Sequence, residues 1–102
     1  MSEIIVAKVG ELAHGQRKIV QAGGTEIAVF NLADKYYAIE NFCPHQGGPV
    51  GKGDISDGDI ITCPLHEWRF NIKTGACADF SGINVKSFPV NIYGNEIKII
   101  VE

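Results

Sequence analysis

The sequence predicts an all-β fold, an antiparallel β-sandwich or small barrel, from two observations. The 12 glycines divide the 102 residues into short segments rich in β-branched and aromatic side chains. None of these segments keeps the i, i+3, i+4, i+7 spacing of apolar residues through three helical turns. Many short strands separated by glycine-rich turns are typical of sandwiches and barrels. We therefore expect eight strands, at residues 3–9, 18–22, 25–32, 36–40, 60–63, 68–72, 85–92 and 96–101.

The connections between these segments carry the residues that tight turns need. Residues 10–15, between the first two strands, have room for one helical turn at most. Residues 33–35 and 93–95 are typical of hairpin connections, and residues 56–59 of a tight turn. In the last strand apolar and charged residues alternate except at Ile100. That exception predicts burial on both faces or an irregular strand end.

Length and composition indicate a single domain, residues 1–102, and exclude several classes of protein. The 9 Lys+Arg against 12 Asp+Glu give a formal net charge of −3, which argues against a nucleic-acid partner. The longest apolar runs fall far short of the roughly 20 residues that a membrane helix needs. The first residues lack the features of a signal peptide, and three cysteines are too few for a disulfide framework. We therefore expect a cytoplasmic protein that does not enter a membrane.

Residues 41–80 differ from both ends of the chain. They contain all three Cys, two of the three His and three of the four Pro. Cys43 and His45 form a C-x-H pair, and Cys63 and His66 form a C-x-x-H pair after 17 intervening residues. Both pairs lie in glycine-rich sequence that buries little apolar surface. The spacing predicts a metal site that gives these loops their shape.

Two chemistries fit two Cys–His pairs. A structural Cys2His2 zinc module would use all four residues as one tetrahedral shell. An iron–sulfur site would place both thiolates on one iron and both imidazoles on the other. Each loop puts Cys-Pro ahead of a His, and glycine-rich backbone can curl around a cluster and direct N–H groups at it. These features favour iron–sulfur, with zinc as the alternative.

At these residues the sequence strongly resembles the Rieske [2Fe–2S] proteins. The resemblance implies one [2Fe–2S] cluster, with Cys43 and Cys63 on one iron and His45 and His66 on the other. It also implies a Rieske-type β-sandwich base at residues 1–40 and 81–102, with a smaller cluster-binding subdomain inserted at residues 41–80. The match runs through residues 41–49, Gly53, Gly58, residues 61–66, 70–71 and 73–75, and weakly through 87–90.

Departures from the family pattern predict a low reduction potential. Rieske proteins of respiratory and photosynthetic cytochrome complexes have an extra Cys in each loop, and the matching positions here are Gly48 and Leu65. High-potential members place Ser and Tyr hydroxyls near the cluster, where this chain has Trp68 and Phe70. Hydrogen bonds to the cluster favour its reduced state, so their absence lowers the reduction potential. We therefore expect a potential near the low end of the roughly −150 to +300 mV Rieske range.

The resemblance implies an electron carrier and not an enzyme. Oxygenases of the family need a second iron held by two His and a carboxylate, and only His14 is left beside His45 and His66. The low-potential Rieske ferredoxins of ring-hydroxylating dioxygenases pass electrons from a flavin-dependent reductase to a terminal oxygenase, and we expect a monomer with this role. The alternative is the small subunit of an NAD(P)H-dependent assimilatory nitrite reductase, bound to its large subunit. The run at residues 43–49 leans toward that alternative, as does Glu67, where most ferredoxins have Gly.

The remaining residues carry simpler expectations. Cys77 is predicted to be a small buried hydrophobic residue, and His14 a solvated loop residue. Trp68 and Phe70 alternate on an expected strand, which predicts a place in the core beneath the cluster. Four acidic residues could form either a rim that steers a basic partner or an ordinary solvated surface: Asp54, Asp57, Asp59 and Glu67.

Overall fold

The computed structural model describes residues 2–22, 24–44, 47–65 and 67–101 and confirms the all-β fold. The strands are β1 (Ser2–Lys8), β2 (Arg17–Ala22), β3 (Thr25–Leu32), β4 (Lys35–Glu40), β5 (Asp54–Ser56), β6 (Ile60–Thr62), β7 (Arg69–Asn71), β8 (Ser87–Phe88), β9 (Val90–Tyr93) and β10 (Glu96–Val101). Two short 3-10 helices, η1 (Val9–Glu11) and η2 (Val50–Lys52), complete the regular elements of the described chain.

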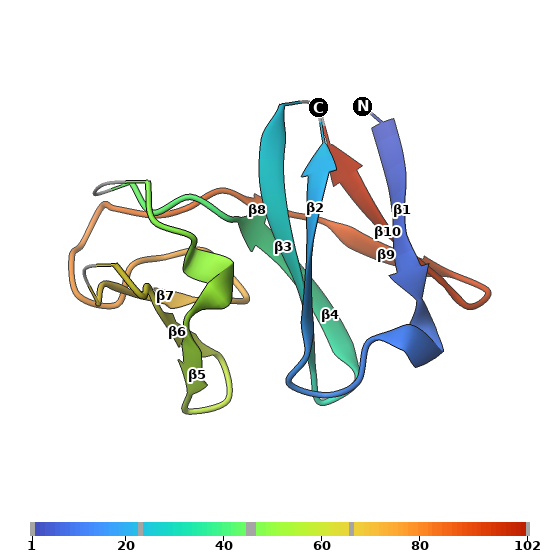
Figure 1. Ribbon diagram of the computed structural model, residues 1–102, viewed down its shortest axis with the longest axis horizontal. Coiled ribbons are helices and arrows are strands. Elements are labelled where there is room, and N and C mark those ends of the chain that lie inside the picture. The colour runs from blue at the N-terminus through green and yellow to red at the C-terminus, as the bar shows by residue number, and fades with distance from the viewer. Residues whose placement is uncertain (1, 23, 45–46, 66, 102) are drawn as a thin grey trace.

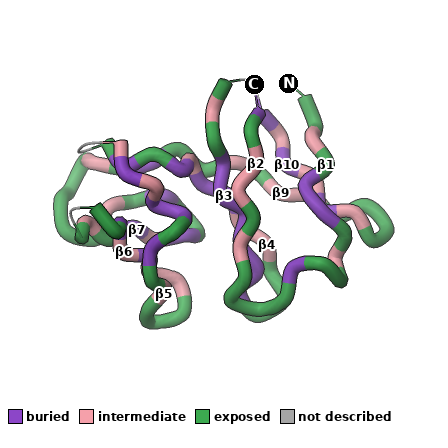
Figure 2. The backbone as a smooth tube through the Cα atoms, in the orientation of Figure 1, coloured by how far each residue is buried: buried purple, intermediate pink, exposed green. Residues whose placement is uncertain are grey.

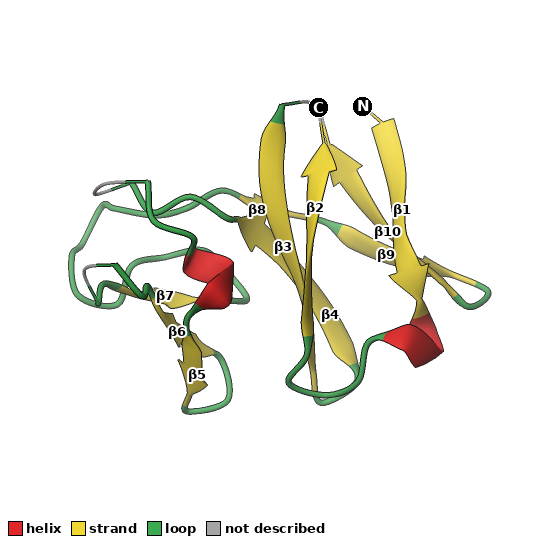
Figure 3. Ribbon diagram, viewed as in Figure 1, coloured by secondary structure: helices red, strands yellow, loops and turns green. Residues whose placement is uncertain are grey.

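The strands form three antiparallel sheets (Figure 1). The middle layer is a four-stranded sheet with the order β2-β3-β4-β8. On one side of it lies the three-stranded sheet β1-β10-β9, and on the other a smaller lobe contains the sheet β5-β6-β7 (Figures 1 and 3). The predicted sandwich is therefore the pair of larger sheets, and the small lobe contains the loops that carry the predicted ligands.

Strand β3 is buried on both of its faces (Figure 2). Ala28, Phe30 and Leu32 point into the core that fills the small lobe. Ile27 and Val29 point the other way, into the core shared with β1 and β10. This alternation follows from the two-residue period of a strand, and it explains why residues 27–32 are a nearly continuous apolar run.

The small lobe continues beyond residue 80. The Val85 N–H donates to the Gly75 carbonyl at 2.8 Å, and the Cys77 N–H donates to the Ile83 carbonyl at 2.9 Å. Ala76 also pairs with Asn84. We therefore propose that residues 81–85 pack with the cluster-binding subdomain, whose expected bounds are 41–80.

The sequence predicted a hairpin connection at residues 33–35, and the β3–β4 hairpin has a two-residue turn there, at Ala33 and Asp34. Ala33 and Asp34 adopt φ angles of 55° and 65°, and Leu32 pairs with Lys35 on either side of them. The Asp34 N–H donates to the side-chain oxygen of buried Asn31 at 2.8 Å. The Ala33 N–H donates to His14 Nδ1 at 2.7 Å, so His14 is exposed, as predicted, but it also supports this turn.

Several elements differ from the sequence prediction. Strand β5 and helix η2 were not expected, because each is only three residues long and gains its shape from its neighbours. The expected strand 85–92 is interrupted at Pro89, which has no N–H to donate to a sheet. The helical turn before β2 is at Val9–Glu11, earlier than residues 10–15.

The break in alternation at Ile100 corresponds to partial burial of the second face of β10. Ile100 is half-buried, on the opposite face from buried Ile99.

No helix in the described residues is long and apolar enough to span a membrane.

Replacing Asp34 with Gly should stabilise the fold. Gly adopts a left-handed φ without the steric cost that a Cβ brings, so we expect the free energy of unfolding to rise by about 0.5–1 kcal/mol. Urea denaturation of the Asp34→Gly variant measures this change. The control is Asp34→Ala, which removes the same carboxylate but keeps a Cβ at a left-handed position. Equal stability of the two variants would contradict the assignment of strain to this turn.

Candidate metal centre

Two loops of the small lobe, the first at residues 41–53 and the second at residues 63–68, bring Cys43 and Cys63 into one buried core. Cys43 lies three residues after the end of β4, and Cys63 directly follows β6. Their exposed fractions are 1% and 0%, and neither forms a disulfide. They share the core of the small lobe with buried Val50, Ile61 and Phe70. Tertiary structure thus places two potential thiolate ligands in the same core, from loops 20 residues apart in sequence.

The two loops close with the same pattern of backbone hydrogen bonds. In the first, the Cys43 N–H donates to the Gly48 carbonyl at 2.8 Å, and the Gly47 N–H donates to the Cys43 carbonyl at 2.6 Å. In the second, the Cys63 N–H donates to the Trp68 carbonyl at 2.7 Å, and the Glu67 N–H donates to the Cys63 carbonyl at 2.9 Å. Each Cys is therefore bonded to the fourth and fifth residues after it. The hydrogen-bonded turns at residues 43–48 and 63–68 are equal in length, although one carries C-x-H and the other C-x-x-H.

The fourth residue after each Cys is left-handed. Gly47 has a φ of 74° and Glu67 a φ of 62°. Gly47 takes this conformation without strain, whereas the Cβ of Glu67 makes it costly. Glu67 therefore adopts the same left-handed conformation as Gly47 in the first loop, at the cost of strain.

Gly48 brings the two loops into contact. A Cβ at Gly48 would lie 2.9 Å from the Cys63 Sγ and 2.9 Å from the Leu65 Cβ. Gly48 and Leu65 are thus neighbours, which agrees with their matching the two extra cysteines of the disulfide-bearing relatives. A Cβ at Gly53 would lie 1.7 Å from the Thr62 carbonyl oxygen, so this glycine lets the first loop pass directly over β6. Both glycines allow a close backbone approach that a Cβ would prevent.

The described residues fit the thiolate half of the predicted centre. Two buried thiols outside any disulfide, on two closed loops, are donors that iron and zinc both prefer. Because Gly48 has no side chain, its backbone can lie close to the Cys63 thiol. His45 and His66, the other predicted ligands, lie outside the described residues. Within the described part of the chain, no three His, Cys, Asp or Glu side chains come together.

A strap from residues 77–84 covers the second loop. Phe80 packs on Trp68 with ring centroids 4.8 Å apart, and an ion pair between Arg69 and Asp79, 2.5 Å long, ties the strap to β7. Phe70 is fully buried and Trp68 is half-buried against the same core, although Trp68 precedes β7. The sequence predicted that Cys77 is buried, but it is only half-buried, beside this core.

The ion pair shifts the pKa values of both partners. The side-chain hydrogen bond from Arg69 lowers the pKa of Asp79 below its ordinary value of 3.8, helped by the Arg69 N–H that donates to Asp79 at 3.0 Å. The same side-chain bond raises the pKa of Arg69. Asp79 therefore remains charged throughout the neutral range.

The four acidic residues do not form one rim. Asp54 and Glu67 line a hollow of about 340 Å³ beside Cys63, together with Lys52. Asp57 and Asp59 lie in the β5–β6 turn, at the far end of β6 from Cys63 (Figure 1). At most two of the four carboxylates therefore lie near the candidate metal centre.

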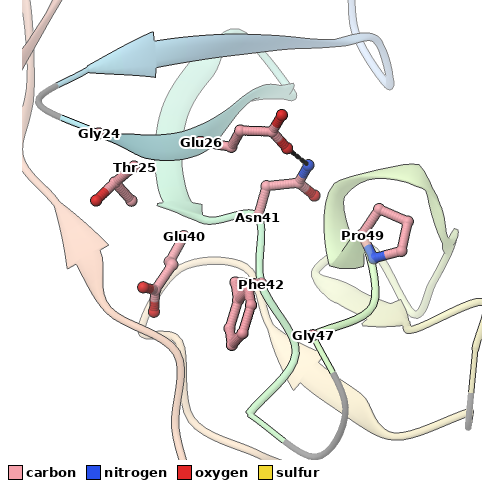
Figure 4. Close-up of a pocket in the computed structure, with 8 residues that line it drawn as sticks. All are labelled: Gly24, Thr25, Glu26, Glu40, Asn41, Phe42, Gly47 and Pro49. Carbon is pink, nitrogen blue, oxygen red and sulfur yellow. Dashed lines mark hydrogen bonds between the residues drawn. The ribbon is translucent and has the colours of Figure 1, made fainter.

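The first loop is anchored to the middle sheet by residues that the sequence analysis did not select. Asn41 is 4% exposed, and its side-chain oxygen accepts the Gly51 N–H at 2.6 Å. Its amide nitrogen donates to Glu26 on β3 at 3.1 Å (Figure 4). Arg17 on β2 donates to the carbonyl oxygens of Gly51 and Gly53. Arg17 and Glu26 are far from the loop in sequence, so no local pattern points to them.

An open hollow of about 380 Å³ lies beside the first loop (Figure 4). Phe42, 54% exposed, and Gly47 line it from the loop, and Glu26 and Glu40 line it from β3 and β4. Both carboxylates already accept hydrogen bonds, from Asn41 and from the Lys86 N–H.

Comparison with known proteins gives consistent matches. The Rieske [2Fe–2S] domain matches residues 2–89. The ferredoxin component of a naphthalene 1,2-dioxygenase system from Pseudomonas aeruginosa is 34% identical over 91 residues, which cover 87% of this chain and 86% of that protein. The chain also matches much longer proteins, of which it spans 15% and 16%.

Solved structures extend these matches. The structure of a complex of reduced oxygenase and oxidized ferredoxin in carbazole 1,9a-dioxygenase contains a chain that is 28% identical, with a TM-score of 0.86, covering 95% of this chain and 100% of that one. A chain from Mycobacterium tuberculosis, solved as a proposed small subunit of an NADH-dependent nitrite reductase, has a TM-score of 0.87 over 96% of this chain and 93% of that one. At 22% identity the latter match shows a shared fold alone.

Replacing Glu67 with Gly should stabilise the second loop. Removing the Cβ relieves the left-handed strain, and we expect a gain of about 1 kcal/mol in the free energy of unfolding. The reciprocal change Gly47→Ala should cost a similar amount, because its Cβ would also lie 3.0 Å from the Phe42 ring. Chemical denaturation measures both. Glu67→Ala removes the charge but keeps the strain, so a gain in that control would show that charge and not backbone strain is responsible.

The strap should contribute to stability in a pH-dependent way. Because the pKa of Asp79 is lowered in the folded state, its contribution is fully present above about pH 4 and is lost as the pH falls through the folded value. Asp79→Asn should therefore lower the Tm at pH 7, and the difference from the unmodified protein should shrink as the pH is lowered below about 4. A Tm difference that stays constant as the pH is lowered through the acid range would contradict this role of the ion pair.

Proposed function

Because this chain belongs to the Rieske [2Fe–2S] domain family, we propose that it is a one-electron carrier that serves a ring-hydroxylating dioxygenase. The pair of equally closed loops that buries Cys43 and Cys63 in one core carries this proposal. A Rieske-type [2Fe–2S] cluster supplies the one-electron chemistry when it is bound. The carrier would receive its electron from a flavin-dependent reductase and deliver it to a terminal oxygenase.

We assign the ligands as the sequence predicted. Cys43 and Cys63 would hold one iron, and His45 and His66 the other. The burial of both cysteines in one core supports their assignment to a shared iron. Cys77 is excluded as a ligand in this proposal, since it lies outside both closed loops.

Exposed apolar side chains support a docking role for the cluster face. Phe42 is 54% exposed next to Cys43, Leu65 is 51% exposed over Gly48, and Phe80 is 45% exposed on Trp68. Weak redox complexes use small interfaces, in which a few apolar contacts suffice. A similar ferredoxin has been solved together with its oxygenase, which supports a terminal oxygenase as the partner here.

The chemistry would then take place on the partner and not on this chain. The candidate ligands are fully used by one cluster, and relatives that cover the same length are ferredoxin components of oxygenase systems. We propose a cytoplasmic monomer, because a shuttle must approach its reductase and its oxygenase through the same exposed face.

The nitrite reductase small subunit is the second candidate. It is supported by the shared fold of the Mycobacterium tuberculosis subunit and by the run at residues 43–49. Reduction of the purified chain by a flavoprotein reductase, followed by oxidation by a terminal oxygenase, would favour the ferredoxin. Stable co-purification with a large nitrite reductase subunit would favour the alternative.

The cluster assignment predicts which cysteines matter for iron. Cys43→Ser and Cys63→Ser should each abolish the visible absorption and the EPR signal of the reduced protein, because each removes a thiolate. Cys77→Ser is the matched control and should keep both signals and about two irons per chain. Metal analysis accompanies the spectra. A colourless protein with one zinc would overturn the proposed function and favour the zinc module.

A further inference from the structure

Arg17 crosses from the middle sheet to the end of the first loop. It is the first residue of β2, and its Nη1 donates to the Gly51 carbonyl at 3.0 Å and also to the Gly53 carbonyl. Its guanidinium lies 5.8 Å from the ring centre of Phe30, a fully buried residue of the same core as Cys43 and Cys63. A charged donor bound to two carbonyls and placed over an aromatic ring is well fixed in position.

The segment that Arg17 holds lies directly on the sheet. A Cβ at Gly51 would lie 2.6 Å from the Ala28 Cβ and 2.8 Å from the Ile19 Cδ1, so the backbone of η2 touches β2 and β3. The Gly51 N–H donates to Asn41 at the start of the same loop. Asn41 is bonded in turn to Glu26, both through its side chain and through its backbone N–H (Figure 4).

These contacts pin both ends of the first loop to the middle sheet. Asn41 holds the beginning of the loop, and Arg17 holds its end at Gly51 and Gly53. Between the two ends the loop carries Cys43, and its Gly48 lies against the Cys63 thiol. The position of the first loop relative to the second therefore depends on the two anchors.

We infer that Arg17 is a positioning residue for the metal centre, which clamps the end of the first loop so that Cys43 and Cys63 stay together. This inference rests on the proposed function for the identity of the metal group, but the clamp itself is a property of the polypeptide. Substituting residues that orient metal ligands without touching the metal commonly weakens metal binding by about 10- to 100-fold.

Lys18 provides a matched control on the same strand. It neighbours Arg17 but points to the opposite side of the sheet, where its Nζ donates to the Val6 carbonyl of β1 at 2.8 Å. Lys18→Met thus removes one positive charge and a side-chain bond to a backbone carbonyl, as Arg17→Met does. Only the Arg17 change acts on the loop that carries Cys43.

The experiment compares the iron-loaded full chain with Arg17→Met, Arg17→Lys and Lys18→Met. Iron release to an excess of chelator is followed by the loss of visible absorption. Amide hydrogen exchange is followed at Lys52 and Gly53, whose N–H groups donate to the Pro49 and Val50 carbonyls. We expect Arg17→Met to release iron about 10- to 100-fold faster and to raise exchange at these two amides. Arg17→Lys keeps the charge and one bond, so we expect an intermediate effect, and it serves as the test if Arg17→Met does not fold.

The control variant distinguishes a clamp on the first loop from a loss of charge or of global stability. Release and exchange in Lys18→Met should match those of the unmodified protein. Equal effects of Arg17→Met and Lys18→Met would overturn the proposal, since the loss of one charge would then account for both. A uniform rise in exchange across β3 and β10 would overturn it as well, because Arg17 would then only stabilise the fold. If the unmodified chain binds no iron, the proposed function fails, while exchange at Lys52 and Gly53 still tests the clamp.

Discussion

The burial of β3 on both faces is the constraint on which the rest of this structure depends. One face packs against the β1-β10-β9 sheet and the other against the lobe that carries Cys43 and Cys63. A strand that is covered on both sides must lie in a middle layer, so the small lobe packs against the sandwich through a shared core. The loops of the lobe are short of apolar residues of their own, and they share a core with Ala28 and Phe30 of the sheet. The sandwich therefore provides the rigid surface against which the metal centre is built.

The candidate metal centre lies on two backbone turns with the same hydrogen-bond pattern, at residues 43–48 and 63–68. Each Cys accepts the N–H of the fourth residue after it and donates to the carbonyl of the fifth. This pattern requires a left-handed residue at the fourth position, which Gly47 supplies easily and Glu67 supplies with strain. Strain of this kind persists only where surrounding contacts determine the backbone, and here the strap with Phe80 and the ion pair of Arg69 with Asp79 lie next to the strained loop. The departure from glycine thus changes the energy of the loop and keeps its shape.

Much of the fold could be predicted from the sequence, and the failures have a common cause. Strands β3 and β10 begin and end at the predicted residues, because each is long, apolar in its pattern and bounded by turn residues. Strand β5 and helix η2 were missed, because three residues are too few for a period and their shape comes from pairing with β6 and from packing on β3. The choice left open for the acidic residues, a rim or a solvated surface, also depended on tertiary structure: Asp57 and Asp59 are close to Asp54 in sequence, but the β5–β6 hairpin places them at the other end of the sheet. The structure buries Cys43 and Cys63 in one core, whereas the assignment of Cys43, Cys63, His45 and His66 as ligands stays a prediction.

The sequence by itself determined the chemistry of this protein. Two Cys–His pairs at short, similar spacing predict the ligand types and the loops that carry them, because both are encoded within a few neighbouring residues. Only the tertiary structure decided how those loops are held. Arg17 and Glu26 contact residues that follow them by 34 and 15 positions, so their roles leave no periodic or local signal. Such contacts exist only after the sheet has formed and has brought these residues together, and they set the relative position of the two loops.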